Sequence, residues 1–287
     1  MKALKNIVFE SLLDMDDENT PLLSDKYIKS KIKQFLKDNY KGASKCKISR
    51  HPDTDGKYIV DSPGDLKNSH YGLKSLTNEY FKFGKVNGFD CGGCGELKTL
   101  EGAPREVVVS FICRGCDGLK TLEGAPQIAK HFYCSNCESL ESLEGAPREV
   151  TGSFACFDCE SLESLKGAPR FVGGNFECFS CDNLKSLEGG PEIVEMDFNC
   201  EYTSITTLKG APMRVRCFTC SMCSELKSLE GGPEVVTMDF DCRFCEKLKS
   251  LKGAPKLVQY DFLCRGCGKE FSRREVTDIV NVGGDIQ

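Results

Sequence analysis

The sequence predicts a repeat solenoid that is mainly β, with parallel strands stacked into a curved slab and short α-helical caps. Three observations predict it. The pattern Phe-x-Cys occurs nine times from Phe89 onward, at a step that is mostly 22 residues. Around each Phe, apolar and polar residues alternate, which is typical of a strand with one buried face. A Gly-x-Pro turn then follows in eight of the nine copies, and a fixed period of this length indicates stacked repeats.

Composition and charge narrow the function class. The chain has 287 residues, 40% hydrophobic and 28% charged, with a net charge of −5. This charge argues against nucleic acid as a partner, and no apolar stretch is long enough to span a membrane. The apolar run near the N-terminus is cut by Glu10 and followed by acidic residues, unlike a signal peptide. We therefore expect a cytoplasmic protein whose 19 cysteines remain thiols.

Residues 1–62 are expected to cap the array with two helices and a hairpin. The first helix is predicted over residues 2–13, from apolar residues at helical spacing. The second begins after the N-cap Ser24 and ends near Tyr40, before Lys41-Gly42. Two strands follow, over 46–49 and 58–61. The segment between them faintly resembles a calcium loop but lacks most of the ligands, so we interpret it as a hairpin turn.

The array itself is predicted over residues 63–267. Each strand should be followed by a Leu-x-x-Leu element that fills the interior, and then by a return limb of turns, because proline opposes a long helix there. The spacing shortens near Val86 and again between Arg214 and Phe218, where an extra Cys217 stands. We expect a bulge or register break at the second place. Residues 268–287 should close the array with a short helix whose capping box is Ser272 with Glu275.

The repeat resembles a known family. Phe-x-Cys-x-x-Cys-x-x-Leu is similar to the leucine-rich repeat segment, with Phe111 and Cys113 at its two strand leucine positions and Cys116 at its asparagine-or-cysteine position. The run Leu-x-Ser-Leu-Glu-Gly-Ala-Pro resembles the short repeats common in proteins of tailed phages and large DNA viruses. The resemblance covers about residues 66 to 267. It implies a leucine-rich-like array, with a parallel β-solenoid as the alternative, and action in the host cytoplasm if the protein is viral.

The paired cysteines have two interpretations. Eight copies carry Cys-x-x-Cys, which normally indicates zinc, and the ninth has Thr203 in the second place. We favour structural thiols, because the pairs keep the repeat register, the first cysteine shares the buried face of Phe, and a threonine hydroxyl cannot replace a thiolate. Disulfides between coils are conceivable if the protein is oxidised. No metal and no cofactor are therefore predicted.

Catalytic groups are not predicted either. On the strand pattern His131 faces outward and Cys134 inward, so they do not form a nucleophile pair. The glycines belong to once-per-coil turns and match no phosphate-binding loop. Paired carboxylates at Asp197 and Asp239 are interpreted as a solvated face. We expect a protein that is not an enzyme.

Function is expected on the exposed sheet face. Its residues, read along the array, are Ile112, Arg114, His131, Tyr133, Phe157, Glu177, Phe179, Asp197, Asn199, Glu201, Asp239, Asp241, Arg243, Asp261, Leu263 and Arg265. The hypothesis is that this face binds a protein partner, with Tyr133, Phe157 and Phe179 as anchors and the acidic stretch steering a basic surface. The alternatives are a structural spacer or virion-associated element and, less favoured, a zinc-binding or redox cysteine ladder.

Overall fold

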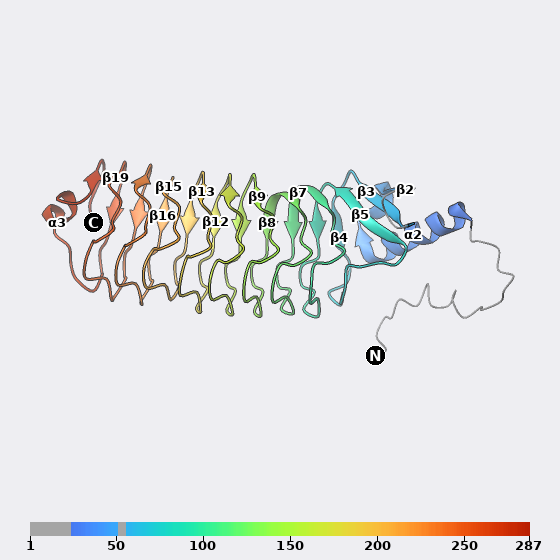
Figure 1. Ribbon diagram of the computed structural model, residues 1–287, viewed down its shortest axis with the longest axis horizontal. Coiled ribbons are helices and arrows are strands. Elements are labelled where there is room, and N and C mark those ends of the chain that lie inside the picture. Colours follow the sequence, from blue (N-terminus) through green and yellow to red (C-terminus); the bar gives the residue numbers. More distant parts are fainter. Residues whose placement is uncertain (1–23, 51–55) are drawn as a thin grey trace.

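The computed structural model describes residues 24–50 and 56–287 and is an elongated parallel β-solenoid (Figure 1). About ten turns of roughly 22 residues follow one another along an axis that is nearly straight in this view. The return limbs contain turns and bends without helices, and the described helices lie at the two ends. The predicted solenoid of stacked parallel strands is therefore confirmed. The helix predicted over residues 2–13 lies outside the described residues.

The Phe-x-Cys segments of successive coils form one parallel ladder, here called the Phe ladder. Equivalent residues pair, as Phe154 does with Phe176. The ladder consists of β4 (Leu66–Asn68), β6 (Phe89–Asp90), the second halves of β7 (Glu106–Ile112) and β8 (Ile128–Tyr133), β10 (Phe154–Ala155), β12 (Phe176–Glu177), β14 (Phe198–Asn199), β16 (Phe218–Thr219), β18 (Phe240–Asp241) and β20 (Phe262–Leu263).

A second parallel ladder, the Val ladder, runs beside the first. Its residues stand a few positions before Phe in each coil, as Val150 and Val172 do. It consists of β3 (Tyr58–Ser62), β5 (Phe81–Val86), the first halves of β7 and β8, β9 (Glu149–Val150), β11 (Phe171–Val172), β13 (Ile193–Val194), β15 (Arg214–Val215), β17 (Val235–Val236), β19 (Leu257–Val258) and β21 (Asn281–Val282).

The ladders differ where the chain shortens near residue 214. In the Phe ladder, Phe198 still pairs with Phe218. In the Val ladder, β13 and β15 are not paired, and β15, β17, β19 and β21 form a separate four-stranded sheet. The expected register break therefore occurs, but in the Val ladder alone.

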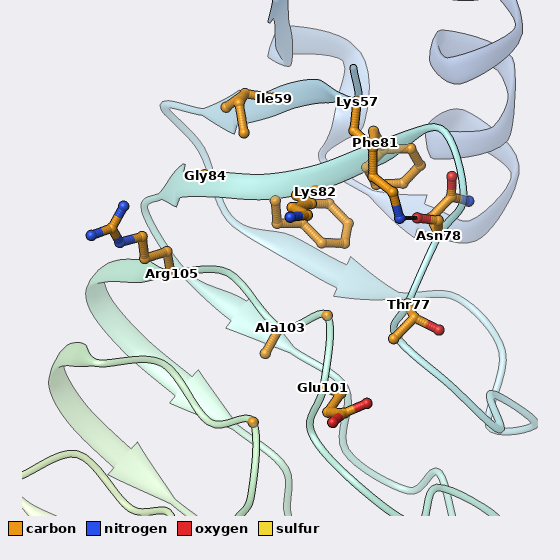
Figure 2. Close-up of a pocket in the computed structure, with 13 residues that line it drawn as sticks. Lys57, Ile59, Thr77, Asn78, Phe81, Lys82, Gly84, Glu101, Ala103 and Arg105 are labelled. Carbon is orange, nitrogen blue, oxygen red and sulfur yellow. Dashed lines mark hydrogen bonds between the residues drawn. The ribbon is translucent and has the colours of Figure 1, made fainter. Parts of the chain in front are cut away.

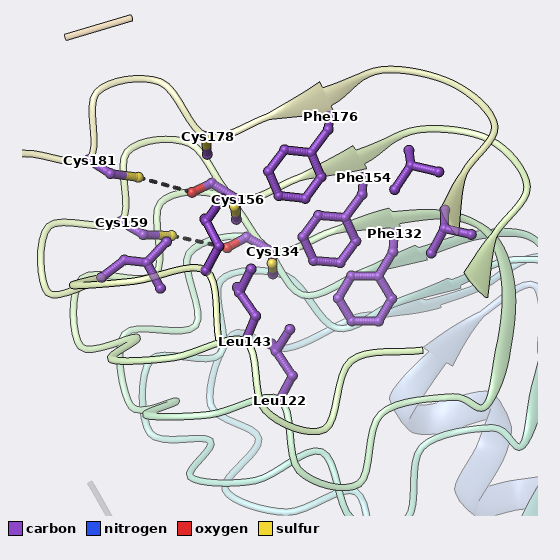
Figure 3. Close-up of a cluster of buried hydrophobic side chains, with 14 of the residues drawn as sticks. Leu122, Phe132, Cys134, Leu143, Phe154, Cys156, Cys159, Phe176, Cys178 and Cys181 are labelled. Atoms are coloured by element: carbon purple, nitrogen blue, oxygen red, sulfur yellow. Dashed lines mark hydrogen bonds between the residues drawn. The ribbon is translucent and has the colours of Figure 1, made fainter. Parts of the chain in front are cut away.

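The core is a column of phenylalanine rings behind the Phe ladder (Figure 3). From Phe89 to Phe262, successive ring centroids are 5.1 to 5.9 Å apart and the ring planes are close to parallel. This spacing follows from the distance of about 4.8 Å between paired strands. The leucines of the return limb, such as Leu162 and Leu165, are fully buried against the same column. Alternation therefore predicted the interior correctly.

The Gly-x-Pro turn returns the chain to the next strand. Gly167 has φ of 87°, which favours glycine. A Cβ atom on Gly167 would lie 2.5 Å from backbone atoms of Glu144 in the preceding coil. The repeated glycine is thus required by both conformation and close coil contact.

Both ends of the stack are covered. At the N-terminal end, α2 (Asp25–Asn39), capped by Ser24, buries Ile32 and Leu36, and η1 (Ala43–Lys45) follows. There β1 (Tyr40–Lys41) and β2 (Lys47–Arg50) pair antiparallel with β4 and β3, so the predicted helix and hairpin are confirmed. The segment 51–55 of the expected hairpin turn is outside the described residues.

At the C-terminal end, α3 (Arg273–Thr277) starts with the predicted capping box of Ser272 and Glu275. The chain then adds part of another coil. β21 continues the Val ladder, and Ile286 forms a parallel bridge with Phe262. The two ladders thus extend beyond the predicted array end at residue 267.

The alanine variant of Phe154 tests the core column. Phe154→Ala should lower the free energy of unfolding by about 3–5 kcal/mol, because it removes a fully buried ring from a packed column. Phe157→Ala, three residues later on the partly exposed face, should cost about 1 kcal/mol. Urea unfolding followed by circular dichroism measures both. Equal losses would contradict the assignment of buried and exposed faces.

Candidate interaction surface

The sixteen predicted surface residues lie in three columns on the outer side of the Phe ladder. The leading column stands just before Phe, the middle column between Phe and the first cysteine, and the trailing column just after that cysteine. The leading column holds His131, Asp197, Asp239 and Asp261; the middle column holds Ile112, Tyr133, Glu177, Asn199, Asp241 and Leu263; the trailing column holds Arg114, Phe157, Phe179, Glu201, Arg243 and Arg265.

The predicted aromatic anchors form contacts with one another or with neighbours. The rings of Phe157 and Phe179 stack with centroids 4.5 Å apart. The Arg114 guanidinium lies 5.1 Å from the centre of the Phe157 ring, an arrangement typical of a cation–π contact. Tyr133 stacks beside His131 at 6.0 Å. All three aromatic anchors remain partly exposed, and the ring contacts join Phe157 to Phe179 and Tyr133 to His131.

Two smaller side chains on this face, Ser135 and Ala155, are buried. Ser135, between Arg114 and Phe157 in the trailing column, is fully buried, and its hydroxyl has no hydrogen-bond partner among the described residues. Ala155 in the middle column is only 1% exposed. Although strand alternation directs Ala155 outward, solvent hardly reaches it.

The acidic stretch is largely engaged within the fold. Leading-column side chains accept backbone N–H bonds from the same position of the next coil. The pairs are Ser153 to His131, Asn175 to Ser153, Asp197 to Asn175, Cys217 to Asp197, Asp261 to Asp239 and Asp285 to Asp261, at 2.8 to 3.4 Å. These carboxylates therefore stabilise the stack itself.

Ion pairs and hydrogen bonds further reduce the free acidic surface. Both Asp197 oxygens accept bonds from Arg216, at 2.9 and 2.6 Å. Burial alone would raise the pKa of Asp197, but the bonds from Arg216 and Cys217 lower it below its usual value. Glu201 accepts a bond from Ser221 at 2.6 Å. The acidic stretch is thus less available for steering than its sequence indicates.

Asp241 is the clearest correction among the predicted residues. It was expected to be displayed, but it is only 7% exposed. The Arg243 guanidinium lies 2.7 Å from its carboxylate and covers it. Of this pair, Arg243 is the group that a partner can contact.

One row of surface residues escaped the sequence prediction. The residue directly before the second cysteine has a positive φ in every coil, and glycine, asparagine, aspartate or serine occupies it in six of the nine coils. Tyr202, Met222 and Phe244 occupy it in three successive coils, at φ of 54° to 59°. They are 38% to 53% exposed. Bulky side chains in this conformation are strained, typically by 1–3 kcal/mol each.

This row, here called the turn row, continues the aromatic cluster. Backbone bonds join it to the trailing column of the next coil, as from Asp158 N–H to the Phe179 carbonyl at 3.1 Å and from Ser180 N–H to the Glu201 carbonyl at 2.9 Å. Tyr202 follows Glu201 directly. The apolar side chains thus pass from the trailing column at Phe157 and Phe179 to the turn row from Tyr202 onward. The sequence does contain a signal for this row: Tyr202, Met222 and Phe244 replace the glycine or small polar residue that the other coils carry before the second cysteine.

His131 carries a defined tautomer. Its Nδ1 accepts the Ser153 N–H at 3.0 Å, so its proton resides on Nε2. The ring packs against Gly152, where a Cβ atom would lie 2.5 Å from the imidazole. Burial, helped by nearby Lys130, lowers the pKa of His131. These contacts assign His131 a structural role in the leading column, and no cysteine side chain is its partner.

The second cysteines form a hydrogen-bonded column inside the stack (Figure 3). Except for Cys94, which donates to the His70 carbonyl, each thiol donates to the backbone carbonyl of the first cysteine in the preceding coil, as Cys159 does to Cys134 at 3.4 Å and Cys181 to Cys156 at 3.2 Å. The same bond recurs at 3.1 to 3.4 Å in five further coils. Thr203 instead donates to the Cys200 carbonyl of its own coil at 2.8 Å.

The pKa of most thiols is raised, so these thiols stay protonated, whereas hydrogen bonds with Cys91, Cys200 and Cys242 lower the pKa of Cys116, Cys223 and Cys267. Burial raises the pKa of Cys156 well above its usual range and that of Cys159 to about 12. Zinc binds thiolates, so these positions oppose the charge state that the metal needs. Within residues 24–50 and 56–287, no group of three or more His, Cys, Asp or Glu side chains is arranged to hold a metal ion. All 19 cysteines lie in this part of the chain, and all are free thiols.

Comparisons with protein-family models, with curated proteins and with solved structures found no match to this chain. The resemblance to leucine-rich repeats and to viral repeat proteins therefore stays a prediction. No helix in the described ranges has the length and apolar character needed to cross a membrane.

Lowering the pH should weaken the hydrogen bond that His131 accepts from the Ser153 N–H in the leading column. The pKa of His131 is lower in the folded than in the unfolded protein, so the folded protein binds fewer protons. The stability that the neutral imidazole contributes is therefore present above the unfolded-state pKa of about 6.5 and is lost as the pH falls through the folded-state pKa. We expect a loss of about 1 kcal/mol for one hydrogen bond between pH 7.5 and 5.0.

His131→Asn provides the matched control for this pH effect. Asn175 shows that asparagine at this position accepts the next N–H, and asparagine does not titrate. Urea unfolding of both proteins at pH 7.5 and 5.0 should therefore give the wild type about 1 kcal/mol more loss on acidification. Identical pH dependence in the two proteins would contradict the role of His131.

Alkylation tests the cysteine column. Under native conditions iodoacetamide should label only Cys46, Cys217 and Cys267, which are partly exposed, while the other thiols react after denaturation. Mass spectrometry of peptides locates the label, and metal analysis of the same sample checks for zinc. Rapid native labelling of Cys159, or several zinc ions retained per chain, would refute the assignment as buried structural thiols.

Proposed function

We propose that the protein is a non-enzymatic binding module that holds a protein partner on the outer side of the Phe ladder. The observation that carries this proposal is the apolar strip from Phe157 and Phe179 to Tyr202, Met222 and Phe244. Exposed aromatic and methionine side chains are enriched where proteins bind one another. A contiguous strip of this kind on a soluble protein typically serves as an interaction site.

The chemistry of the strip indicates what kind of partner it fits. Arg114 lies at one end of the aromatic cluster, and Glu177 and Glu201 stand beside its middle. A partner with apolar anchors and a flanking cation near these glutamates would complement it. The rigid ladder keeps the strip residues in fixed relative positions, which limits the entropy lost on binding.

A structural spacer is the competing function. The continuous Phe ladder and the covered ends favour it as well, because a stiff rod needs neither anchors nor a charged rim. The two functions differ in what the strip side chains do. In a spacer, the exposed apolar surface of the turn row would have no binding partner.

Two sets of variants separate binding from stability. Tyr133→Ala, Phe157→Ala and Phe179→Ala together should reduce capture of the partner from a cell lysate at least tenfold, since each removes a central anchor. The control set Ile128→Ala, Ile193→Ala and Met213→Ala removes apolar side chains that are 53% to 59% exposed on the Val ladder or, for Met213, directly before it. The control should retain full capture. Quantitative mass spectrometry compares the captured proteins, and purified partner then confirms direct binding.

Substitutions in the turn row provide a second test of the same proposal. Tyr202→Asn, Met222→Asn and Phe244→Asn introduce the residue that the chain itself uses at Asn136, in the same conformation. Binding should fall while the melting temperature is kept, because asparagine tolerates positive φ better. Unchanged capture by both the aromatic and the turn-row variants would favour the spacer.

A further inference from the structure

A groove lies where β5 separates from the coil stack (Figure 2), and none of its lining residues belongs to the strip described above. β5 pairs with β7 only through Lys85 and Val86, whereas its first part pairs only with β3. The strands diverge before Lys85 and leave a space of about 750 Å³, lined by Ile59 and Ala103 among others. Phe81 and Phe83 also line it, but their side chains are only 3% and 4% exposed. This is a partly apolar groove at the junction of the N-terminal cap and the first coils.

One wall of the groove is an open strand edge. Tyr58 N–H donates to the Tyr80 carbonyl at 2.9 Å. Because bonding directions alternate along a parallel strand, the backbone groups of Phe81 and Phe83 point to the opposite side, toward the groove. Among the described residues no strand pairs with this part of that edge. Such an edge exposes N–H and C=O groups and is normally covered in soluble proteins.

The groove rim is basic although the protein is acidic overall. Among the described residues, Lys57, Lys82 and Arg105 line it together with one carboxylate, Glu101, and both lysines also have interaction partners of their own. Lys57 is held in place by a bond of 2.9 Å from its Nζ to the Asn78 carbonyl. An occupant with apolar side chains and an acidic stretch would complement this site.

Residues 1–23 of the chain have this composition. Leu4, Ile7, Val8 and Leu12 are followed by Asp14, Asp16, Asp17 and Glu18. The segment joins the described structure at Ser24. The next residue, Asp25, accepts a hydrogen bond of 2.6 Å from the Tyr58 hydroxyl through its carboxylate. Tyr58 follows Lys57 of the groove rim. The chain between residues 13 and 24 spans up to about 35 Å, so its length allows the segment to return to the groove.

We propose that residues 1–23 bind in this groove, with the apolar side chains of residues 4–12 against Ile59 and Ala103 and along the open edge of β5. The acidic residues 14–18 then face the basic rim. Covalent attachment gives the segment an effective concentration in the millimolar range, so modest contacts suffice to hold it. Bound there, it covers the open edge of β5 and shields the first coil.

Photocrosslinking in the full chain tests the site. p-Benzoylphenylalanine in place of Val8 should, on irradiation, give intrachain crosslinks to peptides containing Phe81–Gly84 or residues 101–105. The same probe in place of Tyr71, which is 78% exposed, should leave these peptides unmodified and serves as the control. Arg105→Glu should lower the crosslink yield up to about fivefold by reversing one rim charge.

Arg148→Glu is the matched variant for the rim charge. Arg148 follows the same Gly-Ala-Pro turn two coils later and does not line the groove. It should leave the yield unchanged, and melting curves of both variants confirm folding. Crosslinks between two chains, separated by size on denaturing gels, would instead indicate a second copy as the occupant. That result, crosslinks outside the groove, or equal yields in both arginine variants would each overturn the proposal.

Discussion

Parallel register is the constraint on which the structure depends. Since each ladder pairs equivalent residues, as Phe154 with Phe176, every side chain has a counterpart about 4.8 Å away in the neighbouring coil. Aromatic rings tolerate this by stacking, and the second cysteines by donating to a carbonyl of the preceding coil. Identical charges repel at this distance, and Arg243, whose counterpart in the next coil is Arg265, is paired with the carboxylate of Asp241.

The interior was predictable from the sequence because this constraint repeats there in every coil. Spacing alone identified the buried face of Phe154 and Cys156, and the missing residues near Arg214 identified the break. The surface was less predictable. Burial of Asp241 depends on where Arg243 directs its guanidinium, and the engagement of Asp197 depends on an arginine of the next coil. Such contacts arise from side-chain conformations between coils, which a periodic pattern does not specify.

In the shortened coil, strand pairing is kept in the Phe ladder and lost in the Val ladder. From Phe198 to Phe218 the step is two residues short, with one residue lost between Thr203 and Ile205 and one between Val215 and Phe218. A shift of one residue in the Phe ladder would turn its buried side chains outward. The loss falls instead on the turn and on the Val ladder, where strands of two residues give up little pairing. Cys217 and Arg216 occupy the outer surface as a result.

Backbone strain distinguishes surface side chains that stabilise the fold from those that do not. Asp197, Asp239 and Asp261 look functional in sequence, yet each accepts a backbone N–H from the next coil. The turn row shows the opposite relation. Glycine or asparagine meets the backbone requirement of this row in other coils, so the bulky residues of three consecutive coils add strain while remaining 38% to 53% exposed. Their exposed apolar surface has no role within the coil, and this is why the turn row, more than the carboxylates, points to contact with another molecule.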